Sequence, residues 1–170
     1  QHIKSVLNLE LVKTKKIKSK KLKIVVDAVN STGGIIIPKL LKKLNIDVVE
    51  LYCNPNGDFP HNPEPLKKNL KDLSQKVIEC GADMGIAVDP DVDRLVFMCE
   101  NGEIFGEENT LVACADYVLS KTPGSTVSNL SSSIALRDIT KKHNQSHFYS
   151  AVGEVNVVEK MKKVNAVIGG

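Results

Sequence analysis

MGIAVDPDVDRLVFMC, residues 84–99, is the stretch of sequence that decides the fold. Two apolar runs within it, Met84–Val88 and Leu95–Cys99, have the composition of buried strands, and only the six residues Asp89–Arg94 separate them. Parallel neighbours need a crossover of roughly a dozen residues or more, so these two strands are expected to pair antiparallel. The sequence therefore predicts a sheet with at least one antiparallel pair.

Two further strands are expected upstream, at Lys23–Val29 and Asp47–Tyr52. The first is almost continuously apolar, which is typical of a parallel strand buried on both faces. Apolar residues at helical spacing and the flanking turn residues predict four helices, over residues 1–13, from after the turn Asn30–Gly34 to about Leu44, over 66–80 and over 107 to about 120. The order after the first helix is that of a βαβαββα unit.

The same pattern repeats after the turn-rich segment Thr122–Ser125. Strands are expected at Thr126–Leu130, His147–Ala151 and Ala166–Ile168, with helices over 132–142 and 154–163 between them. The predicted domains are residues 1–121 and 122–170. The predicted fold class is α/β, with two successive βαβαβ-type units, each a small mixed β-sheet covered by helices on both faces.

The repeat makes a prediction about the end of the second unit. If the units match, Gly169–Gly170 correspond to Asp89–Pro90, and the antiparallel strand of the second unit follows residue 170. The chain starts with Gln and ends directly after a strand-like run, so a piece of a longer protein is expected.

Composition argues against several functional classes. The 170 residues are 42% hydrophobic, as in ordinary globular domains, yet no apolar run approaches the roughly 20 residues that span a bilayer. The four cysteines form no C-x-x-C pair, which favours a reducing cytoplasm over a disulfide scaffold. Residues 1–23 hold eight lysines, but Arg94 and Arg137 are the only arginines and aromatic residues are few. We therefore expect neither a membrane nor a nucleic-acid partner.

Three carboxylates alternate in the hexapeptide Asp89–Arg94, at Asp89, Asp91 and Asp93. Side chains at alternate positions of an extended backbone converge on one side, and their mutual repulsion favours a bound cation. Oxygen ligands without His or Cys point to Mg²⁺, with Mn²⁺ or Ca²⁺ as alternatives. The adjacent Arg94 suits a phosphate group, and metal with arginine is the equipment of phosphoryl transfer.

The composition of this loop allows three other interpretations. It could be a solvated acidic turn. It could be a calcium EF-hand with Glu100 at position 12, but position 6 is Arg94 instead of glycine and the flanks are strands, so this interpretation is rejected. It could also be an aspartyl-phosphate phosphatase motif with Asp89 as nucleophile, although that motif ends the first strand of its fold. The phosphatase stays as an alternative.

Four segments together resemble the α-D-phosphohexomutases, a family that includes phosphoglucomutase, phosphomannomutase and phosphoglucosamine mutase. GIAVDPDVDRLVF (85–97) is similar to the family's metal loop. KIVVDAVNSTGGIIIPKLLKKL (23–44) resembles the opening strand and helix of its second domain, and DFPHNPEPLKKNL (58–70) its proline-rich segment. AVGEVNVVEKMKKVNAVIGG (151–170) resembles the third-domain stretch that leads into the sugar-binding loop.

The resemblance implies a specific chemistry. The chain would be the second domain and most of the third of a mutase that interconverts hexose 1-phosphate and 6-phosphate through a phosphoserine and a bisphosphorylated sugar. Its partners would be the phosphorylated hexose and the remaining domains of the parent chain, and the 170 residues alone would be inactive. The competing class is a non-catalytic metal- or phosphate-binding module on the same fold.

The resemblance also implies roles for individual residues. Asp89, Asp91 and Asp93 would hold Mg²⁺, and Arg94 would contact the transferred phosphate. Gly153 and Glu154 would face the substrate, although Glu154 serves equally as an acid in the first turn of a helix. Gly169 and Gly170 would begin the sugar loop.

Four other features of the sequence are expected to have structural roles or little effect on the site. Val92 stands where the family often has small residues, and little consequence is expected. Ser31 or Thr32 is interpreted as a helix cap, as is the run Ser131–Ser133, while His61 is expected to be structural.

Overall fold

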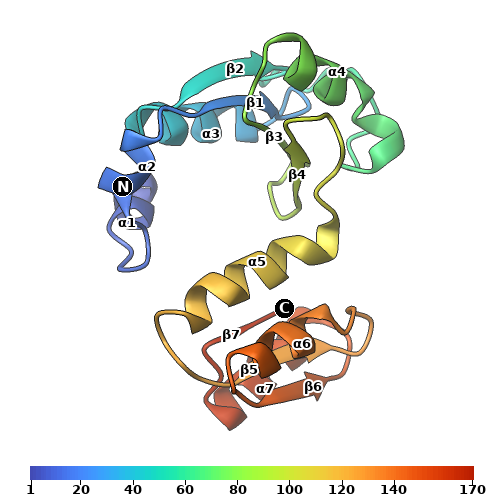
Figure 1. Ribbon diagram of the computed structural model, residues 1–170. Coiled ribbons are helices and arrows are strands. Elements are labelled where there is room, and N and C mark those ends of the chain that lie inside the picture. The colour runs from blue at the N-terminus through green and yellow to red at the C-terminus, as the bar shows by residue number, and fades with distance from the viewer. The chain divides into compact units, whose positions relative to one another are not determined.

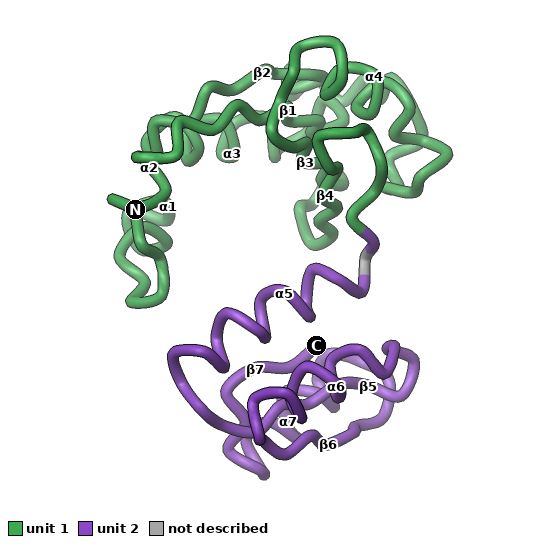
Figure 2. Tube along the Cα trace, viewed as in Figure 1, with its two compact units in different colours: residues 1–105 green, residues 106–170 purple. Residues whose placement is uncertain are grey.

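The computed structural model describes residues 1–106 and 108–170 and forms two compact units, unit 1 (residues 1–105) and unit 2 (residues 106–170) (Figure 2). The predicted boundary after residue 121 differs from this division by one helix. Helix α5 (Glu107–Leu119) packs against α6 (Ala135–Lys142) and strand β7 (Ile168–Gly169), so it belongs to unit 2. The turn-rich segment 122–125 joins α5 to the next strand.

Unit 1 is built on a four-stranded sheet in the order β2-β1-β3-β4 (Figure 1). Its strands are β1 (Lys23–Asp27), β2 (Asp47–Leu51), β3 (Met84–Val88) and β4 (Leu95–Cys99). β1 pairs parallel with β2 and with β3, and β3 pairs antiparallel with β4. The antiparallel hairpin predicted from the short Asp89–Arg94 connection is confirmed.

The helices of unit 1 match the sequence prediction except at the N-terminus and at residues 66–70, where the helix predicted over 66–80 is a short 3₁₀ turn followed by a helix that begins at Lys71. They are α1 (His2–Leu7), α2 (Thr14–Ser19), α3 (Gly33–Lys43), the 3₁₀ turn η1 (Lys67–Asn69) and α4 (Lys71–Glu79). The single helix predicted over residues 1–13 is wrong. Leu7 packs on the core while Leu9 is exposed, so the apolar face is too short to sustain a longer helix.

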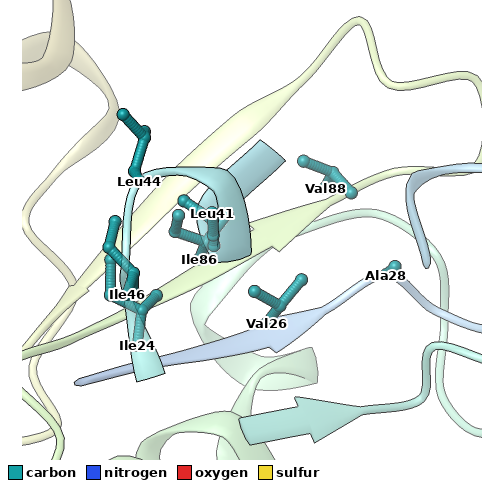
Figure 3. Close-up of a cluster of buried hydrophobic side chains, with 8 residues drawn as sticks. All are labelled: Ile24, Val26, Ala28, Leu41, Leu44, Ile46, Ile86 and Val88. Atoms are coloured by element: carbon teal, nitrogen blue, oxygen red, sulfur yellow. The ribbon is translucent and has the colours of Figure 1, made fainter. Parts of the chain in front are cut away.

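Helices cover both faces of the first sheet. Neighbouring side chains of β1 point to opposite faces, and those on each face are apolar and pack on a helix. Ile24 and Val26 pack with Leu41 of α3 in one buried cluster (Figure 3). Val25 packs with Leu73 of α4 in a second cluster on the other side. The prediction of a sheet buried on both faces is confirmed for unit 1.

Unit 2 repeats this topology with a three-stranded parallel sheet in the order β6-β5-β7. Its remaining elements are β5 (Thr126–Asn129), β6 (His147–Ser150) and α7 (Glu154–Val164). The first strand of each unit lies between the second and the third. The architectural repeat is therefore confirmed.

The predicted match of Gly169–Gly170 to Asp89–Pro90 is wrong by four positions. In unit 1 Ile24 pairs with Met84, and in unit 2 Thr126 pairs with Ile168, so Gly169 occupies the place of Gly85. The predicted strand began too early. Asn165 has the left-handed φ of 51° that ends α7, and the strand starts only at Ile168.

The two matching glycines have the same packing role. A Cβ at Gly85 would lie 2.9 Å from Cγ2 of Val77 in α4, and a Cβ at Gly169 would lie 2.8 Å from Sδ of Met161 in α7. A Cβ at Gly170 would instead approach Leu111 of α5 at 3.0 Å, so α5 and α7 lie on opposite faces of the second sheet.

Candidate metal centre

Three loops leave the carboxyl ends of the parallel strands of unit 1. Because parallel strands end at the same edge of a sheet, the turn after β1, the loop after β2 and the loop Asp89–Arg94 after β3 lie together. Hydrogen bonds from Ser31 to Pro90 and from Arg94 to Glu64 join them. This edge is the usual location of ligand sites in open α/β sheets.

The carboxylates of Asp89, Asp91 and Asp93 gather in the third loop. One oxygen of each lies within 4.8 Å of the others. Asp89 is only 6% exposed, whereas Asp91 and Asp93 face solvent. An all-carboxylate donor set with solvent access suits a hard divalent cation that keeps some of its water, so the residues present fit Mg²⁺.

The acidic side chains have divergent pKa values. Burial raises the pKa of Asp89, but the hydrogen bond from the Arg94 backbone N–H to Asp89 Oδ1 (3.1 Å) and those with Asp93 and Asp91 outweigh it, so the net shift is downward. The hydrogen bond with Asp89, and then the charge of Asp91, raise the pKa of the exposed Asp93. The contact between these two carboxyl groups thus shifts their pKa values in opposite directions, down for Asp89 and up for Asp93.

The exposed side chain of Arg94 lies next to two acidic residues. Its Nη1 lies 3.2 Å from Oε1 of Glu64, and its Nε lies 3.8 Å from Oδ2 of Asp89. The Arg94 and Glu64 side chains are each more than half exposed, so this ion pair is weak and exchangeable. The guanidinium group can thus exchange Glu64 for another anion, because both side chains are exposed to solvent.

The backbone of the loop is strained at Val92. Its φ of 64° lies in the left-handed region that β-branched residues rarely adopt. The Val92 N–H donates to the Asp89 carbonyl at 3.2 Å, which closes the turn between the ligands. The expectation of little consequence concerned the Val92 side chain, which is exposed; the left-handed backbone at this position was not anticipated.

The hydroxyls of Ser31 and Thr32 were interpreted as helix caps, and that interpretation is wrong. In the described part of the chain neither side chain caps α3. Both instead donate to the Pro90 carbonyl, at 2.9 Å and 2.8 Å. Sequence reasoning missed this contact because it links residues almost 60 positions apart. In unit 2 the N-cap of α6 is Ile134 and the described structure gives it no side-chain cap, so the capping prediction for Ser131–Ser133 is also wrong; Ser133 Oγ only accepts a local hydrogen bond from Ala135 N at 3.3 Å.

His61 lies where the loop after β2 meets the sheet. Its Nε2 is 2.9 Å from Oδ2 of Asp27, which is 1% exposed, and its Nδ1 is 2.8 Å from the Asn62 carbonyl. The Val29 N–H donates to the other oxygen of Asp27 at 3.0 Å. His61 thus has the structural place expected for it. The partner of His61 is Asp27, an acidic residue at the end of a buried strand. Such a residue needs a hydrogen-bond partner, and that was the sequence signal that could have indicated this contact.

The remaining candidate residues belong to unit 2. Gly153 precedes α7 with φ 115°, and the exposed Glu154 is the first residue of that helix. Gly169 lies in β7, where a side chain would collide with Met161. Gly170 donates to the Val127 carbonyl and accepts from Asn129 N, so the sheet already uses its backbone.

None of the described helices has the length and apolar character that crossing a membrane requires.

Two α/β/α units in tandem, the first with a carboxylate loop after its third strand, define a class of multidomain α/β proteins. Residues 1–102 match the family model of phosphoglucomutase/phosphomannomutase alpha/beta/alpha domain II, and residues 107–170 match domain III. The chain belongs to the phosphoglucomutase/phosphomannomutase family, as its sequence motifs predict.

Relatives of known name agree with this assignment. The chain is 37% identical over 156 residues to a phosphoglucomutase/phosphomannomutase of Thermococcus kodakarensis. The match covers 91% of this chain and 34% of the relative. It is 34% identical over 151 residues to a probable phosphoglucosamine mutase of Methanopyrus kandleri. That match covers 88% of this chain and 33% of the relative. The chain thus spans about a third of the length of the curated relatives it matches.

Solved structures share the fold. A phosphoglucomutase/phosphomannomutase family protein from Burkholderia thailandensis superposes with a TM-score of 0.82 at 29% identity, over 92% of this chain and 36% of that one. A phosphomannomutase described as putative, from Thermus thermophilus, gives a TM-score of 0.84 at 23% identity, over 99% and 38% of the two chains. The latter likeness concerns the fold alone.

Proposed function

We propose that this chain provides the metal centre of a phosphohexomutase, an enzyme that interconverts hexose 1-phosphate and 6-phosphate. The observation that carries the proposal is the convergence of Asp89, Asp91 and Asp93 beside Arg94 at the carboxyl edge of the first sheet. Membership of the phosphoglucomutase/phosphomannomutase family supports it. The names of the relatives differ in their sugar, so the proposal extends to phosphorylated hexoses as a class.

Each residue of the loop has a role in this proposal. Asp89, Asp91 and Asp93 would hold Mg²⁺, which when bound neutralises charge on a transferring phosphoryl group. The hydrogen bond from the Arg94 backbone N–H favours the ionised form of Asp89. Arg94 exchanges Glu64 for a phosphate oxygen and so orients the group to be transferred. A phosphoserine and a phosphate clamp would come from the remaining domains of the parent chain.

The substrate-binding proposal is narrower than the sequence suggested. Glu154, exposed at the start of α7, can accept a hydrogen bond from a sugar hydroxyl. Gly153 gives the chain its left-handed turn into that helix. The case for Gly169 and Gly170 is weaker, since close packing and the β-ladder account for both.

Divalent-cation binding to the 170-residue chain tests the metal centre. We expect Mn²⁺, a paramagnetic probe for the magnesium site, to bind weakly to the chain and much less to the Asp91→Asn variant. Glu100→Gln is the matched control, because Glu100 is an exposed acid at the end of β4 away from the loop and is not one of the grouped ligands. Equal binding by the chain and by Asp91→Asn would refute the proposed centre.

Activity assays separate the competing functions. The 170-residue chain should not interconvert hexose phosphates, because positioning dominates such catalysis and the phosphoserine lies elsewhere. Detectable interconversion by the purified chain would refute this expectation. Phosphatase activity that disappears in Asp89→Asn would favour the aspartyl-phosphate alternative, and metal binding by a full-length parent without turnover would favour the non-catalytic module. The cytoplasm is the proposed location.

A further inference from the structure

The Pro90 carbonyl receives two hydroxyl hydrogen bonds from outside the metal loop. Ser31 Oγ donates at 2.9 Å and Thr32 Oγ1 at 2.8 Å. Each hydroxyl has a single proton to donate, and a carbonyl oxygen has two lone pairs, so both donors are committed and the acceptor is filled. The turn after β1 thereby fixes the orientation of the peptide between the first and second acidic residues.

The loop needs such an external support. Within it, Val92 N donates to the Asp89 carbonyl and Arg94 N donates to an Asp89 carboxylate oxygen, while Pro90 has no N–H to donate. Val92 holds a left-handed conformation that is costly for a β-branched residue. A free loop would relax this strain and separate the carboxylates.

The two hydroxyls are not needed for the helix that follows them. The first turn of α3 is closed by backbone bonds, from Gly34 N to the Ser31 carbonyl and from Ile35 N to the Thr32 carbonyl. In the part of the chain that the structure describes, α3 has no side-chain cap. Removal of the hydroxyls should therefore leave α3 intact.

We propose that Ser31 and Thr32 are positioning residues that hold the metal loop in its ligand-gathering conformation against the strain at Val92. This inference rests on the proposed function, because the cation is the ligand that the loop would gather. Neither hydroxyl contacts the carboxylates in the described hydrogen bonds, and both act through the Pro90 carbonyl.

The test is the double variant Ser31→Ala/Thr32→Val in the 170-residue chain. Mn²⁺ affinity should fall about tenfold, the change expected when one to two net hydrogen bonds are lost. Ser74→Ala is the matched control, since Ser74 also donates to a backbone carbonyl of unit 1, that of Gly102 at 2.7 Å. Its Mn²⁺ affinity should equal that of the unmodified chain. Unchanged affinity in the double variant would overturn the inference.

Strain at Val92 gives the test its specificity. If the hydroxyls oppose that strain, the loss caused by the double variant should shrink to about twofold or less when Val92→Gly is also present, since the gathered state then needs less support. An equal loss with and without Val92→Gly would show that the hydroxyls do not oppose strain, and would overturn the inference.

A readout without metal separates this inference from the proposed function. Hydrogen exchange of the Val92 and Arg94 amides, followed by NMR in the metal-free chain, should be faster in the double variant than in Ser74→Ala. Absence of Mn²⁺ binding to the unmodified chain would refute the metal centre alone. Unchanged exchange at both amides would overturn the positioning role, whatever the metal binding shows.

Discussion

Replacing His61 by alanine should destabilise unit 1, because the change removes a hydrogen-bond partner of a buried carboxyl group. His61 Nε2 lies 2.9 Å from Oδ2 of Asp27, and the two side chains are 14% and 1% exposed. The Val29 N–H satisfies only the other oxygen. After the substitution, Asp27 Oδ2 loses the partner that the structure gives it.

The size of the effect follows from the burial of Asp27. Leaving a buried acceptor without its hydrogen-bond partner costs roughly 1–3 kcal/mol, and more when the group is charged. Here the vacated ring volume admits water, and burial already raises the pKa of Asp27, so the carboxyl can take up a proton more easily. Both effects offset part of the cost, and we expect a loss of about 2–3 kcal/mol in the free energy of unfolding.

The assay is urea unfolding combined with hydrogen exchange of the β1 amides, which report on unit 1, and of the β5 amides, which report on unit 2. His143→Ala is the matched control. Its Nε2 lies 2.7 Å from Oδ1 of Asp116, but that carboxylate is half exposed, so water replaces the histidine and no measurable loss is expected. Equal losses in the two variants would refute the burial argument. So would a full loss for His61→Ala in an Asp27→Asn background, where the buried charge is absent.

Three other outcomes are expected. In a full-length parent enzyme, Asp91→Asn should remove most mutase activity without changing the circular dichroism spectrum, and near-normal turnover at ordinary Mg²⁺ would exclude the loop from the mechanism. Val92→Gly should raise the free energy of unfolding by up to about 1 kcal/mol, since relief of the left-handed strain exceeds the added freedom of the unfolded chain; a lower urea midpoint would contradict this. Burial, aided by the charge of Arg137, lowers the pKa of His147, so His147 contributes stability above about pH 6.5 that is lost as the pH falls through the lowered pKa. The urea midpoint of unit 2 should therefore fall between pH 7.5 and 5, and His147→Gln should flatten that dependence.

The strands of unit 1 could be predicted because their signals are local. Met84–Val88 and Leu95–Cys99 have the predicted bounds, since apolar runs and a short polar connection leave one pairing available. The acidic loop between them was equally visible. The alternating carboxylates are recognised from six consecutive residues, without any information on the rest of the chain.

The supports of the loop could not be predicted, because each depends on the register of distant strands. Ser31 and Thr32 look like caps to any local reading, and their true acceptor lies on another strand's loop. The partner of His61 is fixed only once the loop after β2 has been placed over the end of β1. Similarly, Gly169 looked like the start of a loop until the ladder placed it at the position of Gly85.

The strand order has a consequence for how each unit can form during synthesis. In both sheets the strand that is made first lies inside, with β2 or β6 on one side of it and β3 or β7 on the other. Every later strand therefore joins an edge that already exists, and no strand has to be inserted between two that are paired. Domains generally fold in the order in which they emerge from the ribosome. The turn that bears Ser31 and Thr32 is therefore synthesised before Asp89, and the acidic loop joins the sheet after the residues that support it have been made.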